Sequence, residues 1–462
     1  MSKNKHKQNG AAKPASSLKG NKARRNLFFI SLTFLVAKLI LILTIQDGGW
    51  LGADGENYLN AMNGLLKDGI FSNAHLLSYW PAGYSIILWG LSKISLAHLL
   101  TVISVFQTII YFIGCAYFVE KLRQTRLTRL AVPVAFLLAI NPTLSLSSLA
   151  VGYESPMASL MILSIGLIIH TELNPSKKTL WKTLPLIAGL QGLSAFMQPR
   201  GLLISFFMFL IWGLRLSSRK QGALLLIAGM AIVMVLPAGE IVRNVRANDF
   251  VSISTNLGTT MFIGIGDGAT GGYNGKYNGV PCPAAEKGTE AKIDSAKVKC
   301  AVIWYLKNPG KTLVLAFKKS EFFWSPWSGP LGNGTMARNP WLKIDPIVNI
   351  AKGSKQGYDL VYGPFGKIVS WLWLLGGLGL LFAGFFGMFK MGGTERLLGL
   401  LTGVPVLLGW LTSIGTIGDH RFRIPTMTAS LFLQVAGFVA LKRGKFKKIT
   451  GLSALEPRGR AR

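Results

Sequence analysis

The sequence predicts an all-α polytopic membrane protein with about ten transmembrane helices, outer-surface amphipathic helices and one large mixed extracytoplasmic loop. Half of the 462 residues are hydrophobic and only 15% are charged, with a mean hydropathy of +0.41, which is too apolar for a soluble protein of this length. The formal net charge is +31. Its basic residues cluster between long apolar runs, which is the pattern that orients membrane proteins, rather than on one domain that could bind nucleic acid.

The first apolar run follows a basic tail and predicts a retained membrane anchor. Residues 1–26 contain eight Lys or Arg and no acid, so we expect a disordered cytoplasmic tail. The run at 26–45 is longer than the apolar part of a signal peptide, and no small-residue cleavage site follows it. The next segment, 46–97, should therefore form a first outer loop.

The stretch "PAGYSIILWGLSKIS" at 81–95 decides the topology. As a helix it would be about 22 Å long, short of the roughly 30 Å hydrocarbon core, and its flanking Trp residues suit an interface. We therefore predict a helix on the outer membrane surface, which leaves the basic connections between spans in the cytoplasm. The ten predicted spans are 26–45, 98–119, 130–150, 156–173, 183–198, 201–215, 222–239, 366–389, 397–414 and 424–441.

These spans divide the chain into regions with both termini cytoplasmic, in the cell inner (plasma) membrane. The regions are an N-terminal membrane core at 27–239, an extracytoplasmic loop at 240–365, C-terminal membrane helices at 366–441 and a basic cytoplasmic tail at 442–462. The long loop is net basic, which is compatible with an outer location because large loops translocate regardless of charge.

The long loop should contain both strands and helices. "NDFVSISTNLGTTMFIGIG" alternates and is rich in β-branched residues, which predicts one or two short strands, whereas "EAKIDSAKVKCAVIWYLKN" and "GKTLVLAFKKSEFFW" predict amphipathic helices. Cys282 and Cys300 both lie in this loop. They could form a disulfide if the loop faces an oxidising compartment, but their spacing alone leaves the pairing open.

Acidic residues on the predicted outer face are the first candidates for chemistry. Asp54 and Glu56 open an amphipathic helix that carries Tyr58 on its apolar face. Asp54 could simply cap that helix, or it could accept a proton from a hydroxyl or hold a divalent cation, although one Asp-x-Glu pair is a weak metal signature. Glu154 in "GYESP" ends another outer turn. It is either an interfacial residue near solvent or a second carboxylate that frames an acceptor or metal site with Asp54.

Basic residues on the outer face break the positive-inside pattern. Each could be a side chain that meets lipid headgroups. Their recurrence on several short turns favours a phosphate site instead, because guanidinium groups bind phosphate oxygens through two parallel hydrogen bonds. They are Arg200 in "QPRG", Arg243 and Arg246 in "RNVR", and His420, Arg421 and Arg423 in "DHRFR".

These features together resemble the GT-C superfamily of membrane glycosyltransferases, especially bacterial relatives of protein O-mannosyltransferases and aminoarabinose transferases. The resemblance lies in the first outer loop with Asp54, "YWPAGY" opening a surface helix, the acid after the third span and the arginine-rich last outer loop. "RNVRANDFVSISTNLGTTMFIGIGDGATGGY" and "DHRFRIP" look like a bacterial branch of that superfamily, over roughly residues 27–441.

The resemblance implies transfer of a sugar from a polyprenyl-phosphate donor to a glycan, lipid or protein acceptor on the outer face. Asp54 matches the first-loop base of the family, and Glu154 matches the acid that shapes the acceptor or metal site; Tyr58 and Tyr84 are candidates for positioning acceptor and donor. The chain departs from the family where Glu56 follows a Gly and where Glu154 replaces an Asp. No cofactor is implied, and a divalent metal on Asp54 and Glu154 stays open.

The expected chemistry fits these charges. Displacing a lipid phosphate from an anomeric carbon builds negative charge on the leaving phosphate, so such an enzyme needs a carboxylate on the acceptor side and arginines on the phosphate side. A single displacement would invert the anomeric centre. A transporter or flippase of anionic lipid-linked solutes would use the same arginines, but it usually has internal repeats and polar residues at mid-membrane, which this sequence does not show. A ligase or polymerase of lipid-linked glycans shares every feature.

Overall fold

The computed structural model describes residues 16–325 except 53 and 278, then 354, 356 and 363–443. Every regular element in these ranges is a helix, so the all-α class is confirmed for them. The rest of the long loop and the end of the C-terminal tail lie outside the described residues. The sequence predicts a disordered tail up to residue 26. The structure describes this tail from residue 16, and there it is helical because α1 (Ser16–Thr44) begins at that residue.

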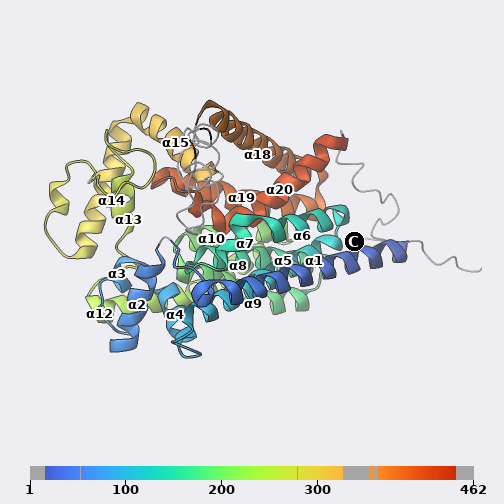
Figure 1. Ribbon diagram of the computed structural model, residues 1–462, viewed down its shortest axis with the longest axis horizontal. Helices are drawn as coiled ribbons and strands as arrows, with labels where there is room; N and C mark the ends of the chain where they lie inside the picture. The colour runs from blue at the N-terminus through green and yellow to red at the C-terminus, as the bar shows by residue number, and fades with distance from the viewer. Residues whose placement is uncertain are drawn as a thin grey trace, which may run out of the picture.

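Seven helical segments of the described chain are long and apolar enough to cross a membrane, whereas the sequence predicts ten spans. Several of them run side by side along the horizontal of Figure 1 and form one bundle. They are α1, α5 (Leu99–Arg123), α8 (Glu154–Leu173), the pair α11 (Arg219–Val233) and α12 (Val235–Asn248), α18 (Pro364–Met391), α19 (Gly393–Gly415) and α20 (Ile424–Arg443).

The other three predicted spans form helices that pack in the same bundle but are too short or too polar to qualify. α9 (Lys177–Met197) begins with charged residues, and α10 (Arg200–Arg215) has only 16 residues. The span predicted at 130–150 is divided into α6 (Ala131–Ile140) and α7 (Pro142–Ser147). A proline has no N–H and disfavours the helical conformation of the residue before it, so Pro142 interrupts this run.

The short helix α7 provides a backbone oxygen for a buried lysine, Lys38, that is not among the residues singled out in the sequence. Asn141 caps α7 by accepting the Leu144 N–H at 3.0 Å. Lys38 of α1 is buried, donates to the backbone oxygen of Ser145 in α7, and lies 5.9 Å from the centre of the Phe34 ring. The cation is therefore held by a carbonyl oxygen and an aromatic face inside the bundle.

Short helices gather at the left-hand end of the bundle in Figure 1. The predicted surface helix at 81–95 is α4 (Gly83–Ser92), which has ten residues and is thus too short to span a bilayer. It packs on α2 (Gly55–Asp68), α5 and α9. The same end carries α3 (Leu76–Tyr79), α13 (Leu257–Ile263), α14 (Glu290–Lys307) and α15 (Pro309–Trp324).

The strand prediction for "NDFVSISTNLGTTMFIGIG" is wrong. The described part of the chain contains no strand, and this stretch forms turns and the helix α13. Phe262 of α13 packs against Ala301 and Trp304 of α14. The alternating pattern was overridden because burial against a neighbouring helix, and not pairing with another strand, covers the apolar side chains.

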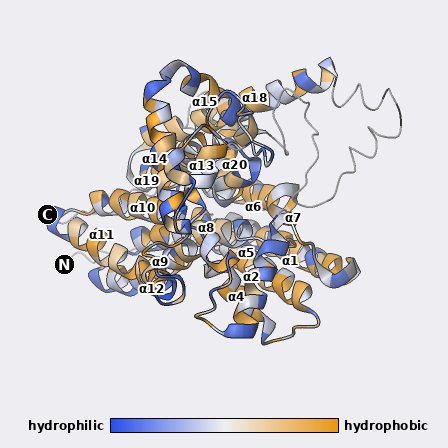
Figure 2. Ribbon diagram, turned by 90° about the vertical axis from the view of Figure 1, so that its left-hand side faces the viewer, coloured by the Kyte–Doolittle hydropathy of each residue, from blue (hydrophilic) through white to orange (hydrophobic). Residues whose placement is uncertain are grey.

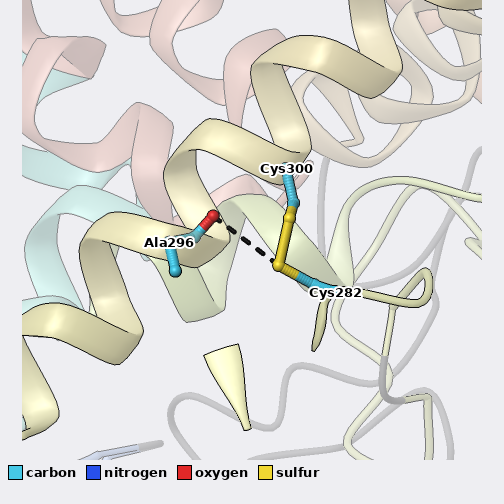
Figure 3. Close-up of a disulfide and its surroundings, with 3 residues drawn as sticks. All are labelled: Cys282, Ala296 and Cys300. Atoms are coloured by element: carbon cyan, nitrogen blue, oxygen red, sulfur yellow. Dashed lines mark hydrogen bonds between the residues drawn. A yellow bond between two sulfur atoms is a disulfide. The ribbon is translucent and has the colours of Figure 1, made fainter. Parts of the chain in front are cut away.

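Cys282 and Cys300 form a disulfide that joins the loop before α14 to that helix (Figure 3). We expect the Cys282→Ser, Cys300→Ser double variant to be less stable by about 3 kcal/mol, because the open loop gains conformational entropy when the protein unfolds. A lowered midpoint of thermal unfolding would show this, with Cys115→Ser, a free thiol, as control. A double variant that melts with the wild type would contradict it.

Buried Lys319 provides a test of the packing between α15 and α19. Its Nζ donates to the Tyr305 hydroxyl at 2.8 Å and to the Ile414 carbonyl oxygen at 2.9 Å. Burial lowers the pKa of Lys319 from 10.5 to about 7. Between these values the unfolded chain binds the additional proton, so the free energy of unfolding should rise with pH from about 7 to 10.

We therefore expect Lys319→Met to lose part of this pH dependence. The wild type should gain up to about 1.4 kcal/mol per pH unit relative to the variant above pH 7, measured as unfolding midpoints at several pH values. Lys318→Met, at the exposed neighbouring position, is the matched control and should run parallel to the wild type. Parallel curves for Lys319→Met would contradict the expectation.

Candidate active site

Two turns that are far apart in the sequence are hydrogen-bonded to each other near the end of the first candidate span. Trp50 donates to the Leu149 oxygen and accepts from the Val151 N–H, both at 2.9 Å. Gly49 permits this approach, because a Cβ there would lie 2.4 Å from the Ser104 hydroxyl oxygen. The contact brings the turn before α2 next to the turn before α8, so that carboxylates from both turns face one region.

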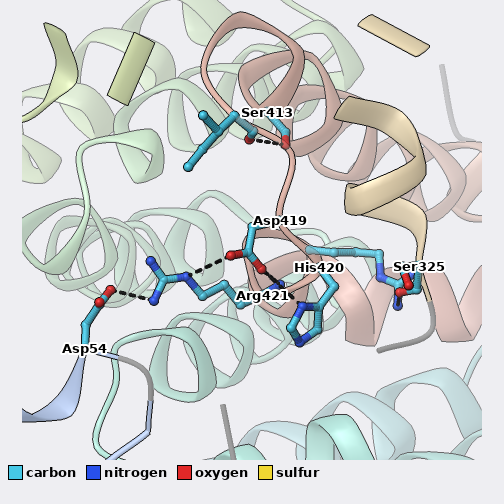
Figure 4. A network of polar contacts seen from close by, with 8 residues as sticks. Asp54, Ser325, Ser413, Asp419, His420 and Arg421 are labelled. Carbon is cyan, nitrogen blue, oxygen red and sulfur yellow. Dashed lines mark hydrogen bonds and ion pairs between the residues drawn. The ribbon is translucent and has the colours of Figure 1, made fainter. Parts of the chain in front are cut away.

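Asp54 stands at the N-cap position of α2 but does not cap it. Its side chain makes no capping hydrogen bond; instead its Oδ2 accepts from Arg421 Nη1 at 2.5 Å (Figure 4). Both side chains are largely buried, with exposed fractions of 18% and 14%. The local role that the sequence allowed for Asp54 has thus been replaced by an ion pair, and its Oδ1 has no hydrogen bond to any described residue.

Arg421 belongs to η5 (His420–Arg423), a short helix whose geometry is set by Asp419. Asp419 Oδ1 accepts the Arg421 backbone N–H at 3.0 Å and lies 3.1 Å from His420 Nδ1, while its Oδ2 is 3.6 Å from Arg421 Nε. Burial alone would raise the pKa of Asp419, but His420 and Arg421 lower it to about 2. Asp419 therefore stays ionised and fixes Arg421 between two carboxylates.

Arg200, at the start of α10, shares an aromatic ring with Arg421. The guanidinium carbon of Arg200 lies 3.9 Å from the centre of the Phe422 ring, and that of Arg421 lies 5.3 Å from it. Arg421 has carboxylate partners, whereas Arg200 has no hydrogen bond or ion pair with any described residue. A guanidinium stacked on an aromatic ring keeps its N–H donors at the ring edge available for an anion.

A pocket of about 390 Å³, including its open mouth, lies against Arg200. Its polar lining includes Tyr153 and Gln198, and its remaining walls are mainly apolar side chains of α8, α10, α19 and α20. Leu203, one of the wall residues, is 38% exposed, as expected for a side chain that faces lipid. The pocket thus joins a cation to an apolar surface of membrane helices.

Tyr153, which lines this pocket, is the N-cap of α8, and Glu154 is the first residue of that helix. Gln198 donates to the Tyr153 hydroxyl oxygen at 3.0 Å. Burial, and then the charge of Glu154, raise the pKa of Tyr153 to about 12, so the hydroxyl keeps its proton for a second partner. Glu154 is buried, and its Oε2 has no hydrogen-bond partner among the described residues. A buried acceptor oxygen without a described partner is uncommon in folded proteins, which makes Glu154 a residue to test beside Asp54.

The remaining candidate residues have other surroundings. Glu56 is exposed on α2. Tyr58 is buried and packs edge-to-face on Tyr84, with ring centres 5.1 Å apart. Tyr84 accepts the Gly152 N–H at 2.8 Å and so supports the turn before Glu154.

Two predicted phosphate ligands use their donors within the protein. Arg243 donates to the carbonyl oxygens of Ile70, Ser72 and Leu77 and thereby holds the segment between α2 and α4. Arg423 donates to the oxygens of Trp324 and Ser325 at 3.1 and 3.2 Å. Arg246 lies 5.4 Å from the Phe71 ring centre, next to the same loop. All three arginines are thus engaged by backbone oxygens or by an aromatic ring away from Arg200.

The described residues do not provide a ready set of metal ligands. No group of three or more His, Cys, Asp or Glu side chains converges in them. Asp54, the main candidate ligand, is engaged by Arg421, and divalent cations such as Mg²⁺ and Ca²⁺ normally need several oxygen ligands. The donor set that the described residues offer therefore does not fit a resident metal.

Some site residues could be found only in the structure. Four residues take part in the site but are not among the sequence candidates: Asp419, Tyr153, Gln198 and Phe422. Asp419 adjoins the "HRFR" signal and Tyr153 precedes Glu154, so proximity to a candidate was the available clue. Nothing in the sequence marks Phe422 as the ring between two arginines.

Solved structures of an archaeal oligosaccharyltransferase align with most of this chain. No family model and no curated protein matches it. The archaeal oligosaccharyltransferase AglB from Archaeoglobus fulgidus, in complex with an inhibitory peptide and a dolichol-phosphate, aligns with 95% of this chain and 53% of its own, with TM-score 0.45 and 14% identity. The apo form of the oligosaccharyltransferase from this organism aligns over 93% and 51%, with TM-score 0.47 and 14% identity.

A complex of the same archaeal enzyme with Zn and sulfate aligns with 90% of this chain and 49% of its own, with TM-score 0.45 and 13% identity. The chain spans about half the length of these solved structures. Each alignment covers nine-tenths or more of this chain at 13–14% sequence identity.

Proposed function

We propose that this protein is a glycosyltransferase that moves a sugar from a polyprenyl-phosphate donor to an acceptor hydroxyl or amide at the outer face of the membrane. One observation carries the proposal: the Asp54–Arg421 pair and Arg200, which has no ion pair with a described residue, flank the same ring, Phe422, at the mouth of an apolar pocket between membrane helices. A base, a cation for a phosphate and a path for a lipid tail thus meet in one place.

The donor phosphate binds Arg200 in this proposal. The guanidinium can donate two parallel hydrogen bonds to phosphate oxygens, and the Tyr153 hydroxyl, which already accepts from Gln198, donates its own proton to a third oxygen. The polyprenyl chain follows the apolar walls of the pocket along α10 and α19. Burying the lipid chain there accounts for a donor site that needs no nucleotide-binding motif.

The acceptor approaches from the side of Asp54 and Glu154. Asp54 Oδ1 takes the proton of the acceptor while the acceptor atom attacks the anomeric carbon from the face opposite the phosphate. The bond between that carbon and the phosphate oxygen breaks, and its electron pair remains on the oxygen, where Arg200 stabilises the charge. Arg421 holds the Asp54 carboxylate in place throughout. This single displacement inverts the anomeric configuration.

Mass spectrometry of lipid-linked sugars and of cell-surface glycans, with and without the gene, tests the proposal. Loss of the gene should remove one sugar from a surface glycan, lipid or protein and cause the matching polyprenyl-phosphate sugar to accumulate. Restoring the gene with wild-type sequence should reverse both changes. A different result would contradict the proposal. If deletion of the gene changes only the side of the membrane on which the intact lipid-linked sugar lies, and purified protein attaches no sugar to any acceptor, the protein is a flippase.

A further inference from the structure

The hairpin formed by α14 and α15 carries an apolar surface that no described residue covers. Six large side chains around its tip are between 43% and 77% exposed, and orange ribbon marks this hydropathy on α15 in Figure 2. Exposed apolar patches of this kind mark sites of interaction in soluble and membrane proteins alike. We call the following residues the hairpin edge: Val302, Ile303, Leu306, Leu313, Val314 and Phe317.

Contacts with α19 place the hairpin at the level where that helix leaves the membrane. Trp410 Nε1 donates to the Ser320 hydroxyl of α15 at 2.8 Å, and its ring lies 5.8 Å from that of Trp324. α19 is a candidate span that ends at Gly415, so Trp410 lies about 7 Å of helix before the end. Because tryptophan rings favour the boundary between headgroups and acyl chains, the C-terminal turns of α15, which carry Ser320 and Trp324, should lie at that depth.

The opposite face of the hairpin is fixed to the bundle, which orients the hairpin edge. Lys319 and Tyr305 both bond to the C-terminal end of α19, through the carbonyl oxygens of Ile414 and Gly415 at 2.9 and 3.1 Å. Phe323 and Leu315, which are buried, complete this contact. The hairpin edge must therefore point away from α19, toward whatever surrounds the bundle at the level of the membrane surface.

The chain around the hairpin edge is strongly basic. Residues 295–320 contain six lysines and no acid. Lys299, Lys307 and Lys318 are exposed and have no ion pair with a described residue. Cations that border an apolar helical face are typical of helices that lie in the membrane interface, where they meet lipid phosphates.

We propose that the hairpin edge inserts into the outer leaflet of the bilayer and that the neighbouring lysines bind the phosphate groups of anionic phospholipids. The hairpin is then an interfacial anchor for the extracytoplasmic loop. It ends at Trp324 and Ser325, whose carbonyl oxygens Arg423 of η5 binds. The anchor therefore also fixes the element that carries Arg421. This proposal stands whether or not the protein transfers sugars.

Fluorescence of a labelled full-length protein in liposomes tests the insertion. The variant Val314→Cys, combined with Cys115→Ser, is labelled with an environment-sensitive thiol dye without reductant, so that the disulfide stays closed. We expect blue-shifted emission, several-fold stronger quenching by nitroxide-labelled phospholipid than at the control, and protection from iodide. The matched control is Lys292→Cys, an exposed position in the first half of α14, where iodide should quench and the lipid should not.

The lipid composition tests the role of the lysines. Raising the phosphatidylglycerol content should increase quenching at position 314, and Lys307→Gln with Lys318→Gln should flatten this increase. Iodide quenching at position 314 equal to that at 292 would overturn the insertion. Protection from both iodide and nitroxide lipid would show that protein covers the hairpin edge and would equally overturn it. Quenching that is independent of phosphatidylglycerol would overturn the headgroup contact.

Discussion

Asp54→Asn should lower the rate of sugar transfer by roughly 10² to 10⁴, the usual contribution of a positioned general base. Asparagine has nearly the size of aspartate, and its side-chain oxygen can still accept from Arg421 Nη1, which lies 2.5 Å from the present carboxylate oxygen. The amide cannot take up the acceptor proton. We therefore expect normal folding, nearly unchanged affinity for the lipid donor, and loss of turnover, measured with purified protein and a polyprenyl-phosphate sugar.

The control for this variant is Asp68→Asn at the other end of α2. Asp68 accepts from the Ser72 hydroxyl at 3.3 Å and lies on the exposed surface, so its neutralisation should leave transfer at the wild-type rate. Near-normal transfer by the Asp54→Asn enzyme would remove Asp54 as the base. Glu154, whose buried Oε2 has no partner among the described residues, and Glu56 would then be the remaining carboxylates to test.

Arg200→Ala should weaken binding of the lipid donor by roughly 10- to 100-fold, because a hydrogen bond to a charged group contributes about 1.5–3 kcal/mol. Turnover should fall as well, since the phosphate carries charge before and during the reaction. The effect distinguishes this residue from Asp54, whose loss should spare binding. Binding of a fluorescent polyprenyl phosphate without any sugar measures it directly.

The same helix supplies the control for Arg200. Arg215 ends α10 and lies 3.5 Å from Glu172, at the opposite end from the pocket. Arg215→Ala should therefore leave donor affinity unchanged, while Arg200→Lys should restore part of it through the remaining charge. Equal affinities for wild type and Arg200→Ala would exclude the proposed phosphate site, even if the protein proves to be a glycosyltransferase.

The sequence alone determined the features that depend on local composition. Burial of a helix in a bilayer requires a run of apolar residues of sufficient length, and such runs located the seven candidate spans and showed that α4 is too short to be one. Seven of the ten predicted runs coincide with candidate spans of the described residues, and the other three are short, polar at one end or broken at Pro142. Acids and arginines at the ends of spans stood out against the charge pattern, which is also a local signal.

Only the tertiary structure decided what those charged residues do. Asp54 could have capped α2. Its carboxylate instead pairs with the guanidinium of Arg421, which lies 367 positions away in the chain. Arg243 and Arg200 look alike in sequence. The guanidinium of Arg243 donates to backbone carbonyl oxygens, whereas that of Arg200 stacks on the ring of Phe422. Whether a charged side chain keeps donors or acceptors for a substrate depends on the partners that its own protein supplies. That depends on contacts between distant segments, which no local pattern records.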